Sequence, residues 1–187
     1  MQCDMQLALD YKPQVLPAYS PTMILRQWTW RPITVHDLRR AKSMSQRREV
    51  ILPDYSKIIR PNYGQTLSLL QLLLNQAAKG PFDLSVDIET RAGHIACIGL
   101  AWSTSEAFCI PLMCVERQDG YWTLDEETQI LYLLWKLLTH RNAAVVGQNF
   151  LYDAQYFYRW LGYMPNLKWD TMLAQHSMFS NMPTARS

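Results

Sequence analysis

The chain has 187 residues, of which 49% are hydrophobic and 18% charged, and its formal net charge at pH 7 is +2. This composition is typical of a globular protein with a full hydrophobic core, and it excludes an intrinsically disordered chain. No apolar run reaches the ~20 residues of a membrane-spanning helix, and the first residues lack the apolar segment of a signal peptide. We therefore expect a cytoplasmic protein with no membrane partner.

Residues 1–54 form a basic segment that contains Pro and Trp. Between Arg26 and Arg60, nine Lys or Arg stand against three Asp or Glu, which gives a net charge of +6. Residues 1–35 show no clear hydrophobic periodicity and are predicted to be extended, whereas residues 36–49 are compatible with a short basic helix. Two interpretations stay open for this charge: contact with the backbone of a polyanion, or a solvated helix face.

Residues 55–187 form a second region, in which strand and helix patterns follow one another. Three strand patterns joined by short turns are followed by alternating helices and strands. This order predicts an α/β fold with helices on both faces of the sheet. The expected strands are 55–60, 82–89, 94–102, 106–111, 143–147 and 167–170, and the expected helices are 63–80, 124–140, about 150–161, and one from residue 171.

Two acids interrupt the strand pattern of "FDLSVDIETR", residues 82–91. Side chains of a strand alternate between its faces, so Asp87 and Glu89 point to the same side. Two like charges this close weaken a fold unless a cation lies between them. Taken alone, an Asp-x-Glu pair is a weak signal, because it also occurs by chance on exposed strands.

A second polar group lies in "VVGQNFLYDAQYF", residues 145–157. Gly147 is predicted to allow a tight turn from a buried strand into a helix. Asn149 and Asp153 are four residues apart, which predicts that they share one face of that helix near its start. Sites in open α/β sheets form at the carboxyl ends of strands, where Asp153 would approach Asp87 and Glu89. Three carboxylates favour Mg²⁺ or Mn²⁺, and two such ions ~4 Å apart suit phosphoryl displacement.

Three stretches, "VDIET", "VVGQNFLYDAQYF" and "WDTMLAQHSMFSNMP", resemble the proofreading 3′–5′ exonuclease domain of family A DNA polymerases, particularly of phage type. That family belongs to the DEDD exonucleases. The resemblance implies a ribonuclease H-like fold with a mixed five-stranded sheet. It also implies a two-metal site for Mg²⁺ or Mn²⁺, the 3′ end of single-stranded DNA as partner, and the cytoplasm of a bacterium or a phage-infected host.

The resemblance assigns roles to individual residues of this chain. It implies that Asp87, Glu89 and Asp153 are the catalytic metal ligands. It implies that Asn149 positions the terminal nucleotide and that Thr90 lies close to its base or sugar. Asp170 occupies the position of a helix-capping Asp, and we interpret it as structural.

The sequence departs from the family pattern near its end. The family's fourth carboxylate lies in a Tyr-x-x-x-Asp motif on a later helix, whereas this sequence reads "TARS" after "SNMP". We interpret the chain as a C-terminally incomplete exonuclease domain that lacks the last helix, with the remaining polymerase part as a possible separate chain. The alternative that stays open is a catalytically dead module that binds single-stranded nucleic acid. A ribonuclease of the same superfamily is a third hypothesis, but the Gly-Gln-Asn-x-x-x-Asp and Trp-Asp-Thr-Met stretches favour the polymerase branch over it.

Overall fold

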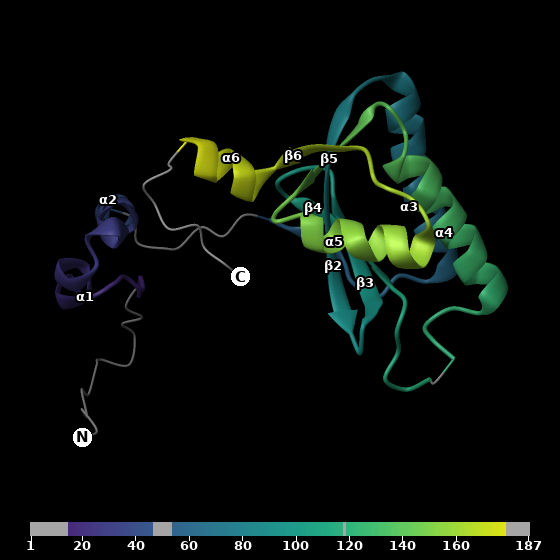
Figure 1. Cartoon of the computed structure of the whole chain (residues 1–187), viewed down its shortest axis with the longest axis horizontal. Coiled ribbons are helices and arrows are strands. Elements are labelled where there is room, and N and C mark those ends of the chain that lie inside the picture. Colours follow the sequence, from purple (N-terminus) through teal and green to yellow (C-terminus); the bar gives the residue numbers. More distant parts are fainter. Residues whose placement is uncertain (1–14, 47–53, 118, 179–187) are drawn as a thin grey trace. The chain divides into compact units, whose positions relative to one another are not determined.

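The computed structural model describes residues 15–46, 54–117 and 119–178. These residues belong to two compact units, which meet in sequence between residues 53 and 54. Figure 1 shows the helices of the first unit and the sheet of the second. Among the described residues, no helix is both long and apolar enough to cross a membrane.

The described part of the first unit contains α1 (Pro21–Arg26), the 3-10 helix η1 (Trp28–Trp30) and α2 (Arg31–Ser45). The expectation of an extended chain up to residue 35 is therefore wrong for these elements. Ser20 starts α1, because its side chain accepts a hydrogen bond from the Met23 N–H and Pro21 follows at the first helical position.

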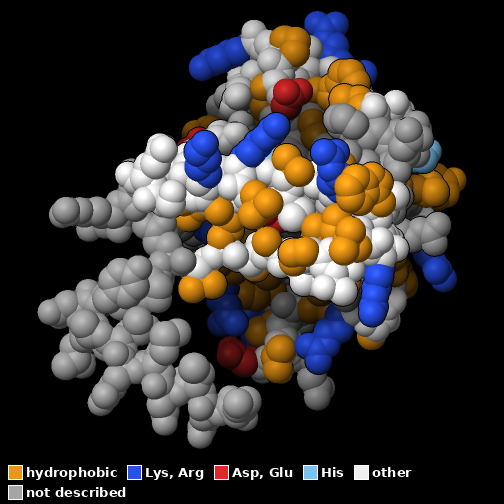
Figure 2. Space-filling model, turned by 90° about the vertical axis from the view of Figure 1, so that its left-hand side faces the viewer, with side chains coloured by type: hydrophobic (Ala, Val, Ile, Leu, Met, Phe, Trp, Pro, Cys, Tyr) orange, Lys and Arg blue, Asp and Glu red, His pale blue; other side chains and the backbone are white. Residues whose placement is uncertain are grey.

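Figure 2 shows Lys and Arg side chains interspersed with hydrophobic ones on the visible face of the molecule.

The second unit is built on a six-stranded mixed sheet with the order β1-β4-β3-β2-β5-β6. The sheet has one strand more than the five that the resemblance implied, because β1 pairs in parallel with β4 at the edge. Strands β2, β3 and β4 form an antiparallel meander, and β5 and β6 continue the sheet in parallel with β2. The strands are β1 (Ser56–Ile58), β2 (Phe82–Arg91), β3 (His94–Ala101), β4 (Glu106–Pro111), β5 (Ala143–Gly147) and β6 (Leu167–Asp170).

The helices of this unit are α3 (Tyr63–Lys79), α4 (Leu124–Leu138), α5 (Leu151–Tyr156) and α6 (Thr171–Met178), with a π-helical turn, η2 (Phe157–Leu161), directly after α5. Capping boxes start the two long helices, with Asn62 and Gln65 at α3 and Thr123 and Glu126 at α4. The helix patterns of the sequence are thus confirmed.

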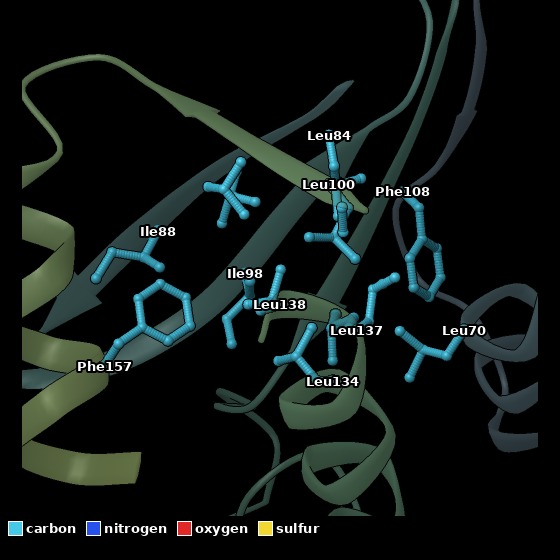
Figure 3. Close-up of a cluster of buried hydrophobic side chains, with 14 of the residues drawn as sticks. Leu70, Leu84, Ile88, Ile98, Leu100, Phe108, Leu134, Leu137, Leu138 and Phe157 are labelled. Atoms are coloured by element: carbon cyan, nitrogen blue, oxygen red, sulfur yellow. The ribbon is translucent and has the colours of Figure 1, made fainter. Parts of the chain in front are cut away.

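One continuous hydrophobic core joins the sheet to α3, α4 and α5. Leu84, Val86 and Ile88 of β2 face this core, and Figure 3 shows Ile88 beside Phe157 and Ile98 near the leucines of α4. The alternate residues of β2, among them Asp87 and Glu89, are exposed. The predicted α/β architecture is confirmed.

Candidate active site

The carboxylates of Asp87 and Glu89 lie on the exposed side of β2, as the alternation of the sequence predicts. β5 pairs with β2 only from Phe82 to Ser85. Beyond Ser85, the edge of β2 that faces β5 has no strand partner, so its backbone N–H groups need other acceptors. The two acids thus lie where the sheet opens at the carboxyl ends of β2 and β5.

Asp153 of α5 fills this open edge. Its side chain is only 4% exposed, and its Oδ1 accepts a hydrogen bond of 3.0 Å from the backbone N–H of Ile88. That amide lies between Asp87 and Glu89 in the chain. The hydrogen bond therefore places the Asp153 carboxylate at the strand edge between the two acids of β2, although 65 residues separate it from Ile88.

The surroundings of Asp153 disfavour its negative charge. Burial raises the pKa of this carboxyl, and the nearby charges of Asp87 and Asp170 raise it further, although the Ile88 N–H opposes this shift. A buried carboxylate beside another carboxylate is unfavourable unless a cation compensates it. The electrostatics at Asp153 thus fit a cation-binding site.

The turn between β5 and α5 contains Asn149, which the sequence analysis had placed inside the helix. Asn149, not Gly147, adopts the left-handed conformation, with φ of 52°. Gly147 is needed for space, because a Cβ atom there would collide with the buried ring of Phe150. α5 begins at Leu151, so the prediction that Asn149 shares a helix face with Asp153 is wrong. Asn149 instead precedes the helix, in the turn that changes the direction of the chain before α5.

Asp170 holds this turn in place. Its carboxylate accepts hydrogen bonds from the backbone N–H groups of Asn149 and Phe150 at 3.0 and 2.8 Å. It also accepts from Met172 and Leu173 in the first turn of α6, which confirms the predicted capping role. Partial burial raises the pKa of Asp170, but the four backbone donors outweigh it, and the net pKa is lowered. Asp170 is therefore a structural carboxylate that joins two helix starts.

Thr90 reaches the site from the end of β2. Its Oγ1 lies 2.8 Å from the hydroxyl oxygen of Tyr152, the residue before Asp153. The hydrogen bond with Thr90 lowers the pKa of Tyr152, whereas the charges of Asp153 and Glu89 act in the opposite direction. These four side chains are thus close enough to influence one another. Sequence reasoning missed Tyr152, which is 44% exposed and available to a ligand.

The donor set fits a hard divalent cation, because Asp87, Glu89 and Asp153 offer only carboxylate oxygens. Within residues 15–46, 54–117 and 119–178, however, no three His, Cys, Asp or Glu side chains are gathered closely enough to hold a metal ion. The fold brings Asp153 next to Asp87 and to the backbone between Asp87 and Glu89. It does not gather the three carboxylates into a closed cluster.

Comparison with known proteins identifies the family of the chain. Residues 62–181 match the model of the 3′–5′ exonuclease family. The chain therefore belongs to the 3′–5′ exonuclease family, whose members are hydrolases of phosphodiester bonds. No curated protein matches the sequence.

Three solved structures are similar to the fold at low sequence identity. The catalytic core of RRP6 from Trypanosoma brucei has a TM-score of 0.49 and 14% identity, with 73% of this chain and 34% of that chain covered. RNase D of Escherichia coli has a TM-score of 0.46 and 15% identity, with 72% and 31% covered. The EXD2 exonuclease domain soaked in Mn and GMP has a TM-score of 0.47 and 13% identity, with 71% and 65% covered. The chain thus spans about a third of the first two.

Proposed function

We propose that this domain removes 3′-terminal nucleotides from single-stranded DNA, as part of a DNA polymerase, with Asp87, Glu89 and Asp153 as ligands of Mg²⁺ or Mn²⁺. The observation that carries the proposal is the hydrogen bond from the Ile88 N–H to Asp153, because it joins the second acidic motif to the first. When bound, two divalent ions supply an activated water and stabilise the departing 3′ oxygen.

The residues of the chain have separate tasks in this proposal. Asp153 carries a buried charge that favours cation binding, and the acids of β2 complete the set of oxygen ligands. Thr90 and Tyr152 form a hydrogen-bonded pair beside the carboxylates, where they contact the sugar or base of the terminal nucleotide. Asn149 contacts the same nucleotide from the turn that Asp170 holds.

A second candidate is a catalytically inactive module that binds single-stranded nucleic acid. The absence of a closed carboxylate cluster among the described residues favours it. Hydrolysis requires reacting groups held in place, and a misplacement of ~1 Å costs about 100-fold in rate, whereas binding tolerates looser geometry. A ribonuclease is the third candidate, since RNase D is described as an exoribonuclease involved in structured RNA processing.

The test is digestion of single-stranded DNA labelled at its 5′ end, with Mn²⁺ or EDTA, and of RNA of the same sequence. We expect stepwise shortening from the 3′ end that needs Mn²⁺ and is abolished in Asp87→Asn, Glu89→Gln and Asp153→Asn. Asp83→Asn is the matched control, because Asp83 is exposed on the same side of the same strand. Metal-dependent binding without shortening would favour the inactive module, and faster digestion of RNA would favour the ribonuclease.

A further inference from the structure

A cleft lies beyond the carboxylates, at the far end of β2. Its volume is about 460 Å³, and its lining includes two arginines, Arg91 and Arg117, together with the apolar side chains of Met113 and Val115. Arg91 is the last residue of β2, and Arg117 comes from the segment that follows β4. Both arginines are exposed to solvent.

The backbone builds this cleft through an irregularity of the sheet. Glu89 pairs with Cys97 and Thr90 with Ile95, so Ala96 is an extra residue of β3. The Ala96 carbonyl is free to accept hydrogen bonds from the N–H groups of Leu112 and Met113, at 2.8 and 3.0 Å. The bulge therefore fixes the start of residues 112–117 against the hairpin.

Arg117 is held at the other wall of the cleft. Its Nη1 donates a hydrogen bond of 3.3 Å to the Tyr121 carbonyl, and the Tyr121 N–H donates to the Leu112 carbonyl at 3.0 Å. Gly120, with φ of 98°, also lines the cleft, and a Cβ atom there would crowd the Leu112 carbonyl. The guanidinium group is thus attached to the same backbone that forms the cleft.

The cleft and the candidate active site share strand β2, which carries Arg91 as well as Asp87 and Glu89. The extra residue is in β3, so β2 keeps its alternation, and Arg91 lies on the same side of β2 as Asp87 and Glu89. Arg91 lies two residues beyond Glu89, which is ~7 Å along a strand. This length is about the spacing between neighbouring phosphates on an extended nucleic acid strand. Asp119 and Glu127 line a neighbouring cleft, where they would repel a phosphate.

We propose that the Arg91–Arg117 cleft binds the single-stranded polynucleotide on the 5′ side of the bond that is cleaved. The assignment of the cleft to the 5′ side of the cleaved bond rests on the proposed function. The 3′-terminal nucleotide carries only the phosphate that is attacked, so a second phosphate at the arginines belongs to an upstream nucleotide. The guanidinium groups contact phosphate oxygens, and Met113 and Val115 offer an apolar wall to a sugar or base.

The test measures binding of the full chain to a 5′-fluorescein-labelled oligothymidylate of twelve nucleotides by fluorescence anisotropy in EDTA. We expect Arg91→Gln and Arg117→Gln each to weaken binding about tenfold. The slope of log K against log salt concentration should become shallower by about 0.7 for each phosphate that the variant no longer neutralises. Arg91→Lys keeps the charge and is expected to retain most of the affinity. Arg141→Gln is the control, because Arg141 is exposed in the turn before β5, at the opposite end of that strand from the site.

A second readout uses unlabelled oligothymidylates of two to six nucleotides as competitors. The wild-type chain should bind more tightly when a second phosphate is added, and the Arg91→Gln/Arg117→Gln double variant should not. Normal binding by both single variants, or an equally weakened Arg141→Gln, overturns the proposal. Binding is measured in EDTA, so it does not depend on the divalent ion. If the variants bind as expected but the wild-type chain cleaves nothing, the exonuclease function is refuted and the cleft proposal stands. A chain that cleaves but whose variants bind normally refutes the cleft alone.

Discussion

Asp153 and Asp170 lie close enough for their charges to interact, yet the fold treats the two carboxylates in opposite ways. Asp170 accepts hydrogen bonds from four backbone N–H groups, and its pKa is lowered. Asp153 is buried, accepts from the Ile88 N–H and meets the charge of Asp87, and its pKa is raised. A carboxylate with many backbone donors stabilises the architecture, whereas one with few donors and a like charge nearby reduces stability. The second kind is typical of functional sites.

The largest effect on stability is expected from Asp170→Ala. Removing this acceptor leaves the N–H groups of Asn149, Phe150, Met172 and Leu173 without their partner, at an expected cost of about 2–4 kcal/mol in the free energy of unfolding. Urea unfolding followed by circular dichroism measures this cost. Asp170→Asn keeps one acceptor oxygen and should be destabilised less. A cost below about 0.5 kcal/mol for Asp170→Ala would remove the contrast between the two carboxylates.

A smaller effect of opposite sign is expected from Asp153→Asn. The amide oxygen still accepts from the Ile88 N–H, but the buried negative charge is gone. At pH 7 and without metal, we expect the midpoint of thermal unfolding to rise by about 2–4 °C, which corresponds to about 1 kcal/mol in a domain of this size. Asp83→Asn, on the exposed side of β2, should change little.

This gain should depend on pH in a defined direction. The pKa of Asp153 is raised in the folded state, so its cost is absent below the unfolded pKa of about 3.9 and grows as pH rises toward the folded pKa. The advantage of Asp153→Asn should therefore disappear at acidic pH. An advantage that is equal at acidic and neutral pH, or a variant that is less stable than the wild type at pH 7, would show that the Asp153 charge is not destabilising.

Local patterns of the sequence predicted much of this molecule. Strand alternation placed Asp87 and Glu89 on one side of β2, and helical periodicity located α3 and α4. The resemblance to the exonuclease family, and not a local pattern, identified Asp170 as a helix cap. The second role of Asp170 was not predictable in this way, because its contacts with Asn149 and Phe150 cross 21 and 20 residues. The pairing of β1 with β4 was not predictable from local patterns either, because it joins a three-residue strand to a strand that is distant in the sequence.

The position of Asn149 was predicted wrongly for a different reason. Gly147 was expected to allow a tight turn, and its missing side chain makes room for the ring of Phe150, but the left-handed residue of the turn is Asn149, which was expected inside the helix. Asn tolerates that conformation better than most residues with a side chain, which is the signal in the sequence that identifies it.

The central claim is that Asp87 and Asp153 are ligands of the same divalent-metal site. Isothermal titration of the full chain with Mn²⁺ tests it most directly, with Asp87→Asn, Asp153→Asn and the control Asp83→Asn measured in parallel. We expect the wild type and Asp83→Asn to bind Mn²⁺ with the same affinity, and each of the other two variants to bind at least tenfold more weakly, because one carboxylate ligand is missing. Mn²⁺ binding of wild-type strength in Asp153→Asn, or no binding by the wild-type chain, would contradict the claim.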